Sequence, residues 1–206
     1  MRANSRIVDP DLYSVAVSTP DPIIRRPRPD DALELARASF LAEERVELAT
    51  LATQIDISQA TLYRWFGSRE QLIDQVLGLL TDEFTASAAV DAEGEGDERI
   101  LDFIRRVMAS TVSFAPVRTL VAKEPQLALR LLLGAGQAVQ RGLVRALREC
   151  VAESRSPEQA RALGGEIDTI VQVGTALEWA TLVAGDEPDL DRVVEIARAL
   201  LAAHQG

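Results

Sequence analysis

The residues that could do chemistry in this chain are gathered in one short stretch, SQATLYRWFGSREQL, at positions 58–72. Gln59 carries an amide that can pair with both polar atoms of an adenine edge, and Ala60 has a methyl group that can pack against thymine. Tyr63 offers a hydroxyl for a phosphate oxygen, and Arg64 beside it adds positive charge. Residues 58–69 contain no acid, although the whole chain has a formal charge of −10. These residue types favour contact with a nucleic acid.

Two short helices joined by a tight turn must position these side chains. The apolar residues between 48 and 66 recur at helical spacing, and the small Ala52 suits a steep helix crossing. Asp56 stands four residues later, where the chain must reverse, and aspartate tolerates the left-handed backbone conformation. The pattern predicts a helix-turn-helix unit whose second helix lies in the major groove. Its expected core is Leu51, Ile55, Ile57, Leu62, Trp65 and Phe66.

Arg69 follows in the first turn of the next helix, after Gly67 ends the second helix of the unit and Ser68 caps the new one. There its charge would combine with free backbone N–H groups to bind a phosphate. Ordinary packing of amphipathic helices is the alternative interpretation, and it accounts fully for Trp65 and Phe66. The expected DNA-binding residues are Thr50, Ser58, Gln59, Ala60, Thr61, Tyr63, Arg64 and Arg69.

Helical periodicity continues along the whole chain, and no segment requires a β-strand. The acidic linker DAEGEGDE separates the first four helices from the rest. We therefore expect an all-α fold of about nine helices. Their expected ranges are 30–41, 47–54, 58–66, 68–88, 100–114, a short connector at 117–123, 125–153, 157–184 and 190–203.

Composition excludes several classes of chemistry. With one Cys and one His, His204, a single chain cannot assemble a zinc site from these residue types or a plausible Ser-His-Asp triad. No phosphate-binding or dinucleotide-binding glycine motif is present, although a pair of carboxylates could still do acid–base work. We expect no enzyme, no metal and no cofactor. No apolar run reaches the roughly 18–20 residues that span a bilayer, and no signal peptide is evident, so we expect a cytoplasmic protein without membrane contact.

The stretch that opens this section resembles the TetR family of transcriptional regulators, whose pattern there is near S-x-x-T-L-Y-x-x-F-x-S-K-E-x-L. The matching residues are Ser58, Thr61, Leu62, Tyr63, Phe66, Ser68, Glu70 and Leu72, with Arg69 in place of the usual Lys. The sequence of residues 45–72 is also similar to that of a subgroup linked to control of quorum-signal lactone degradation. Asp56 replaces the usual turn Gly, and Glu47 replaces the usual Thr or Ser, so a phosphate contact from Glu47 is doubtful.

The resemblance implies a homodimer with a three-helix DNA-binding head and a C-terminal domain for ligand binding and dimerisation. We therefore expect a helix-turn-helix domain at 30–76 and the second domain at 77–206, with the junction along the fourth helix. Residues 1–29 hold five of the nine prolines and read as a flexible arm. Its arginines could enter the minor groove of DNA, or the arm could be a solvated tail.

The C-terminal half contains a helix over 157–184 that is apolar on nearly all sides, as a helix buried by several neighbours is. With the last helix it could form a self-complementary interface through Ile167, Ile170, Gly174, Leu177, Val194 and Ala197; a monomeric core is the alternative. Polar groups set among apolar ones indicate a small-molecule pocket, although each could instead be a surface or interface group. The expected lining is Phe103, Val107, Phe114, Arg130, Leu133, Gln137, Thr175 and Trp179.

Together these features predict a ligand-responsive transcriptional regulator, a repressor in the first instance. It would bind a near-palindromic double-stranded DNA operator as a homodimer and would be released by a small-molecule effector. The alternative is a helical ligand-binding or protein-interaction module that has lost DNA binding, which the acidic composition and Glu47 favour.

Overall fold

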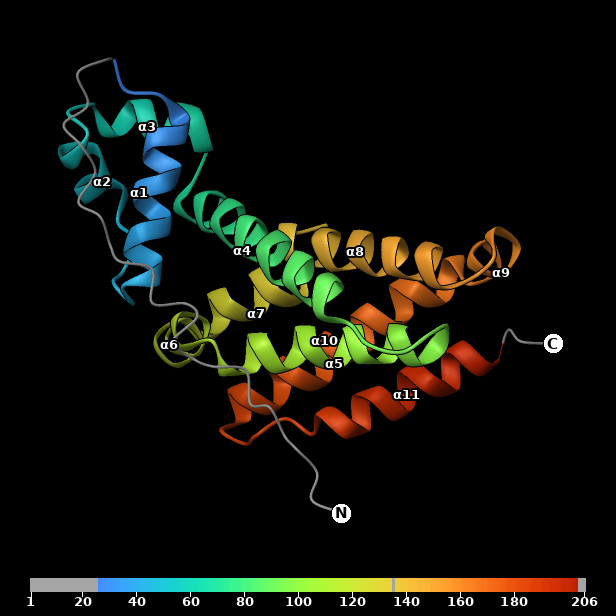
Figure 1. Ribbon diagram of the computed structural model, residues 1–206. Helices are drawn as coiled ribbons and strands as arrows, with labels where there is room; N and C mark the ends of the chain where they lie inside the picture. Colours follow the sequence, from blue (N-terminus) through green and yellow to red (C-terminus); the bar gives the residue numbers. More distant parts are fainter. Residues whose placement is uncertain (1–25, 135, 204–206) are drawn as a thin grey trace.

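Every regular element in the described part of the computed structural model is an α-helix; that part comprises residues 26–134 and 136–203. The first three helices form a small head that stands apart from a larger helical body (Figure 1). The head consists of α1 (Pro29–Leu41), α2 (Leu48–Gln54) and α3 (Gln59–Phe66). The body consists of α5 (Asp97–Ser113), α6 (Ala115–Lys123), α7 (Pro125–Leu133), α8 (Ala138–Ser154), α9 (Pro157–Ala162), α10 (Gly164–Ala184) and α11 (Leu190–Ala202).

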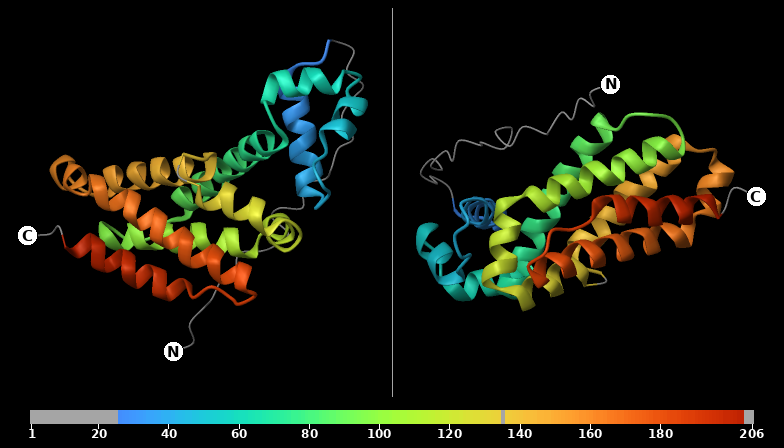
Figure 2. Two further views of the ribbon diagram at one scale, coloured as in Figure 1. Left: turned by 180° about the vertical axis from the view of Figure 1, so that it is seen from behind. Right: turned by 90° about the horizontal axis from the view of Figure 1, so that it is seen from below.

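The long helix α4 (Arg69–Asp91) begins in the head and ends in the body, packing against α1 at one end and α5 and α8 at the other. Two small residues allow its close approach to α8. A Cβ added at Gly78 would lie 2.8 Å from the Cβ of Ala138, and one at Gly142 would lie 2.9 Å from Thr81 Cγ2. The two expected domains are therefore joined by an uninterrupted helix, not by a loose linker (Figure 2).

Local caps and turns fix the geometry of the head. The Ser58 hydroxyl accepts a hydrogen bond from the Thr61 backbone N–H at 3.2 Å, and thereby begins α3. Asp56 has φ +54°, which confirms the left-handed turn expected from the sequence. Gly67 ends α3 with φ +77°, and a Cβ there would lie 2.0 Å from Gln71 Oε1, so a side chain would be strained.

A continuous apolar core lies under these helices. Ala36 of α1, Leu51 of α2, and Leu62 and Phe66 of α3 are all buried and belong to one cluster. The same cluster extends through α4, α6 and α7 to Trp179 of α10. A second cluster fills the far end of the body, between the end of α4 and helices α5, α8, α10 and α11. The core of the head and part of the core of the body are thus one packed unit.

The all-α fold is confirmed, but two helices that the sequence predicted as single are each divided. The range 125–153 breaks after Leu133, where Gly134 is extended and Gly136 has φ +86°. The range 157–184 breaks at Leu163, whose side chain is completely buried just before two glycines that favour helix weakly. The described residues therefore form eleven helices where about nine were expected.

Parts of two expectations lie outside the described residues. They are residues 1–25, which make up most of the proline-containing arm, and His204. No described helix has both the length and the apolar content needed to cross a membrane.

Candidate nucleic-acid interface and ligand cavity

Helix α3 presents a polar surface on the side opposite its core. Gln59, Ala60 and Arg64 are exposed, and Tyr63 is 49% exposed, while Leu62 and Phe66 hold the helix to α1 and α2. The structure therefore brings four of the expected DNA-binding residues together on one face. The buried side chains of α3 fix the helix in place, and the polar groups on its other face remain exposed to solvent.

The three smaller expected residues have different local roles. Ser58 caps α3, and its hydroxyl lies 2.9 Å from that of Thr61, which is half-buried. Thr50 is exposed on α2. Ser58 is thus already engaged in local structure, while Thr50 is open to solvent.

No ion pair or side-chain hydrogen bond joins Arg64 to any described residue, whereas two other arginines of the head are paired. Arg37 pairs with Glu83 at 2.8 Å, and Arg45 pairs with Glu47 at 3.1 Å. Among the described residues no acid pairs with Arg64, and its exposed position on α3 leaves its charge accessible to a polyanion.

Arg69 is a correction to the sequence-based expectation. Its guanidinium donates to Glu124 through Nη1 at 2.8 Å and through Nη2 at 2.6 Å, and its Nε donates to the Val46 carbonyl at 2.6 Å. Hydrogen bonding from Arg69 lowers the pKa of Glu124 below its usual range, against the opposing effect of burial. Arg69 therefore joins the head to the junction of α6 and α7 and does not present its charge to a phosphate.

Other polar contacts reinforce the same junction. Arg130 of α7, expected in the ligand pocket, is instead exposed and donates two hydrogen bonds of 3.1 Å to Glu70 of α4. Thr119 of α6 donates to the carboxylate of Glu43, a residue held at φ +58° at the end of α1. A cavity of about 330 Å³, lined by both charged and apolar side chains, lies between the head and α6. We call these three contacts, Arg69–Glu124, Arg130–Glu70 and Thr119–Glu43, the head–body clamp.

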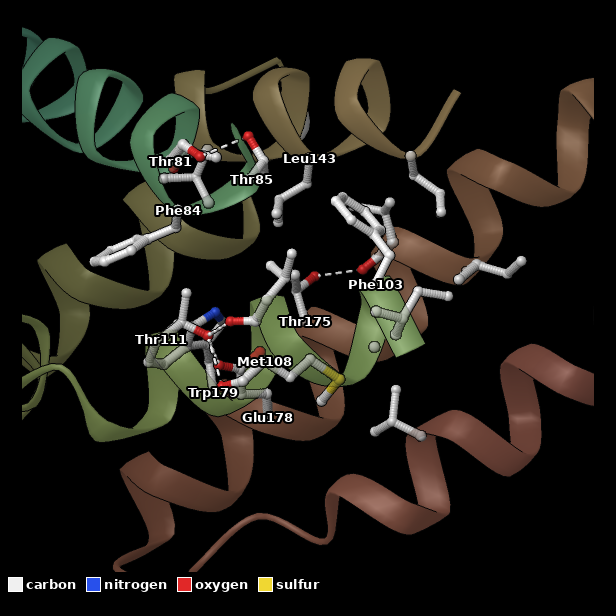
Figure 3. Close-up of a pocket in the computed structure, with 18 residues that line it drawn as sticks. Thr81, Phe84, Thr85, Phe103, Met108, Thr111, Leu143, Thr175, Glu178 and Trp179 are labelled. Atoms are coloured by element: carbon white, nitrogen blue, oxygen red, sulfur yellow. Dashed lines mark hydrogen bonds between the residues drawn. The ribbon is translucent and has the colours of Figure 1, made fainter. Parts of the chain in front are cut away.

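A second, smaller cavity lies inside the body, with a volume of about 70 Å³. Figure 3 shows side chains from several helices pointing into it, among them Phe103, Thr175 and Trp179. The lining is almost wholly apolar. It consists of Thr81, Phe84, Thr85, Phe103, Ile104, Val107, Met108, Thr111, Val139, Leu143, Leu147, Ile170, Val171, Gly174, Thr175, Glu178, Trp179 and Val193.

Glu178 is the one charged or titratable side chain in this lining. It is 3% exposed, and its Oε1 accepts a hydrogen bond from the Thr111 hydroxyl at 2.5 Å. Burial raises the pKa of Glu178 to about 8, while the bond from Thr111 acts in the opposite direction. The carboxyl group is therefore mostly neutral at pH 7 in the unliganded protein.

Four of the eight expected pocket residues line this cavity: Phe103, Val107, Thr175 and Trp179. Arg130 and three others do not. Phe114 packs edge-to-face on the cavity residue Phe84 with ring centroids 5.0 Å apart, and Leu133 and Gln137 flank the α7–α8 turn. Of these, Gln137 is the N-cap residue of α8, in the turn that divides the expected helix over 125–153.

Comparison with known proteins gives the family. Residues 95–202 match the family model described as "Tetracyclin repressor-like, C-terminal domain". The chain belongs to the TetR family. The family resemblance of the head sequence is thereby confirmed from the other half of the chain.

Two solved TetR-family structures resemble the whole chain. The transcriptional repressor QsdR of R. erythropolis has a TM-score of 0.77 and 27% identity, covering 84% of this chain and 94% of that one. QsdR is the regulator of the subgroup that the head sequence resembles. The repressor AlkX of Dietzia sp. strain DQ12-45-1b, implicated in n-alkane biodegradation, shares the fold, with a TM-score of 0.59 and 20% identity over 88% of this chain and 97% of that one. No curated protein matches the chain.

The expected interface residues of this TetR-family chain need a correction. Ile167, Ile170, Gly174, Val194 and Ala197 are all buried within the single chain, where α10 packs on α7, α8 and α11. Only the sixth, Leu177, is at the surface, 39% exposed. The uncovered apolar face of α10 is instead formed by Val173, Leu177, Ala180 and Val183.

Sequence reasoning missed most of the cavity lining, including its one acid, Glu178, and also missed Gln140 behind it. Gln140 is buried and donates hydrogen bonds of 2.8 Å to the Leu132 carbonyl and to Thr175 Oγ1, which orients the cavity-lining threonine. The available signal for Glu178 was a single acid in the otherwise apolar run TALEWATLV. An unpaired acid in an apolar helix is unusual enough to mark a site.

Proposed function

We propose that this TetR-family chain is a ligand-responsive transcriptional repressor that binds a near-palindromic DNA operator as a homodimer. Gln59, Ala60 and Tyr63 would contact base edges and phosphates, and Arg64 would supply the free positive charge. A small molecule in the 70 Å³ cavity would act as the effector and would weaken DNA binding. The similar structures of QsdR and AlkX are both of transcriptional repressors, which supports the assignment.

The observation that carries the proposal is the combination on α3 of an anchored core face and an unpaired polar face. A helix that only packed would leave its exposed residues varied and paired among themselves. Here the exposed face carries an amide, a methyl group, a phenol and an uncompensated guanidinium within two turns. Those are the groups that read base edges and bind phosphate in the major groove.

A second copy would be recruited through the uncovered apolar face of α10. Val173, Leu177, Ala180 and Val183 lie along one side of the helix at spacings of four, three and three. Burying such a stripe against its own symmetry mate removes apolar area from water on both copies. Two heads held in this way would meet successive major grooves about 34–36 Å apart.

Effector binding would act on the head through the packed core and the head–body clamp. One apolar cluster contains both Phe66 of α3 and Trp179 of the cavity, with α4, α6 and α7 between them. A molecule that fits the cavity better in one arrangement of these helices would favour the corresponding spacing of the two heads. The effector would then change DNA affinity only by its differential affinity for the two arrangements.

The direct test is selection of the purified protein against a randomised duplex pool, followed by fluorescence anisotropy with the selected duplex at several salt concentrations. We expect a near-palindrome whose binding weakens steeply as salt rises, because phosphate contacts release counterions. Sedimentation velocity at micromolar concentration should show a dimer, not the 22.4 kDa monomer. A folded protein that enriches no sequence at low salt would refute the proposal.

That negative result would support a second function, an interaction module that has lost DNA binding. Arg69 is the specific observation in its favour, because a charge expected at the DNA is committed to Glu124 instead. Glu47 at the start of α2 adds negative charge to the same face of the head. Ligand binding in the cavity would persist in such a module.

A further inference from the structure

The lining of the cavity in the body contains one acidic side chain and no basic one. Its lining comes from α4, α5, α8, α10 and α11, and Glu178 is the only titratable or charged side chain among the lining residues. Helices α6 and α7, which also pack against α10, contribute no residue to the lining. Within the described part of the chain, no arginine, lysine or histidine therefore faces this carboxyl group across the cavity.

One oxygen of Glu178 is open to the cavity. Its Oε1 is occupied by Thr111, but its Oε2 has no hydrogen-bond partner among the described residues. The fully enclosed, unpartnered side-chain atoms of the described chain are Arg37 Nε and Ser154 Oγ, so Glu178 Oε2 is not walled off. Glu178 is 3% exposed and belongs to the cavity lining, so its carboxyl group borders internal space.

Thr111 lets this carboxyl group change its charge without moving a helix. Its Oγ1 lies 2.5 Å from Glu178 Oε1 and also 3.0 Å and 3.2 Å from the carbonyls of Met108 and Val107. A hydroxyl group has one proton to donate. When Glu178 is neutral, its own O–H can make the short bond and the Thr111 proton can turn to the helix carbonyls. When Glu178 ionises, the Thr111 hydroxyl can donate to it.

We propose that this cavity takes a small, mostly hydrocarbon molecule with one amine, whose ammonium group pairs with Glu178. The ligand would supply the positive charge that the protein does not. Its hydrocarbon part would contact apolar side chains such as Val107 and Leu143, and Trp179, an aromatic residue of the kind that can attract a cation, belongs to the same lining. The proposal rests on the proposed role of the cavity as the effector site.

The volume limits the size of the ligand. An internal cavity of 150 Å³ binds benzene, and this one has about 70 Å³. The ligand should therefore be smaller than benzene, and a slender four-carbon chain with one polar group is taken as the largest suitable probe. Butylamine, 1-butanol and 2-butanone have the same number of non-hydrogen atoms and differ in whether they carry a cation, a neutral donor or only an acceptor.

The test measures binding of these three probes to the wild-type protein by calorimetry between pH 6 and pH 8.5. An alkylammonium stays protonated throughout, as a lysine side chain does. Because its binding expels the Glu178 proton, butylamine affinity should rise by nearly tenfold per pH unit from pH 6 and level off as pH passes through about 8. Affinity for 2-butanone, which can use only the neutral acid, should be flat below pH 8. Equal or tighter binding of 2-butanone at pH 7.5 would overturn the proposal, as would a butylamine affinity independent of pH.

Glu178→Gln is the matched variant, because it keeps the shape and polarity of the side chain and removes only its charge. We expect butylamine affinity to fall at least tenfold at pH 7.5 and 1-butanol affinity to stay within about twofold. These measurements need no DNA, so they remain interpretable if the protein recognises no operator. If the wild-type protein binds an operator but binds no butylamine, the ligand class is wrong and the regulator assignment stands.

Discussion

Glu178 makes the stability of the folded chain depend on pH in a predictable direction. The group has a pKa of about 8 in the folded protein and an ordinary value of 4.5. Between these values the folded protein holds a proton that the unfolded chain releases, so the free energy of unfolding falls as pH rises. The contribution is fully favourable below pH 4.5 and is lost as pH rises through about 8.

The magnitude follows from the size of the shift. Each pH unit between these two values lowers the free energy of unfolding by about 1.4 kcal/mol. At pH 7 the stabilisation from Glu178 should therefore be about 3 kcal/mol smaller than at pH 4.5. For a chain of this length, 3 kcal/mol corresponds to a fall in Tm of roughly 6–12 °C. Glu178→Gln cannot ionise and should lack this slope. The variant should therefore gain stability over wild type with increasing pH.

The assay is chemical unfolding of both proteins at fixed protein concentration, at half-unit steps from pH 5 to pH 8. Glu195→Gln is the control, because it makes the same chemical change at an exposed position on α11. Its curve should run parallel to wild type, whereas the difference between wild type and Glu178→Gln should grow by about 1.4 kcal/mol per pH unit. Parallel curves for all three proteins would refute the reasoning, since they would mean that Glu178 is ionised in the folded state at pH 5.

Three further outcomes test other parts of the structure. Arg64→Ala should weaken operator binding by about 1–3 kcal/mol and reduce the salt dependence of binding by about one phosphate contact. Arg69→Ala should leave the salt dependence unchanged and lower the stability of the protein by about 1–2 kcal/mol. A reduced salt dependence in the Arg69 variant would contradict its assignment to the head–body clamp. Gly67→Ala should destabilise the protein by at least about 1–2 kcal/mol in urea unfolding, because the positive φ disfavours any side chain, and an unchanged midpoint would show that the turn can relax. Leu177→Glu should shift sedimentation toward the 22.4 kDa monomer, whereas Leu79→Glu, at a leucine on α4 with similar exposure, should not, and equal effects of the two would argue against the α10 face.

The head could be predicted almost completely from its sequence, because its signals are local. The caps, the Asp56 turn and the alternation of core and exposed residues on α3 all depend on neighbours within a few positions. Arg69 could not be predicted, since its partner Glu124 is 55 positions away and only the tertiary fold brings the two together. A basic residue at the expected position of a DNA-binding motif can bind phosphate only if no acid from a distant part of the chain forms an ion pair with it.

The body was harder to predict for the same reason. Periodicity located its helices, but it did not reveal which side of an apolar helix faces inward, and five of six expected interface residues proved to be core. The break at Gly134 places Gln137 in the turn between α7 and α8, and Arg130 pairs with Glu70, 60 positions away, instead of facing the cavity. The acid that distinguishes the cavity, Glu178, was overlooked because it lies between two residues already assigned to apolar surfaces.

The head–body clamp also has a consequence for hybrid regulators, in which the head of one protein is fused to the body of another. A crossover placed within α4 would preserve the helix but would separate Arg69 and Glu70 from Glu124 and Arg130. Glu124 of the body would then remain beside the new head without its arginine, and Arg130 would remain without its acid. A functional hybrid should therefore carry residues 119–130 together with the native head, or should import an arginine and a glutamate at the two positions that face them.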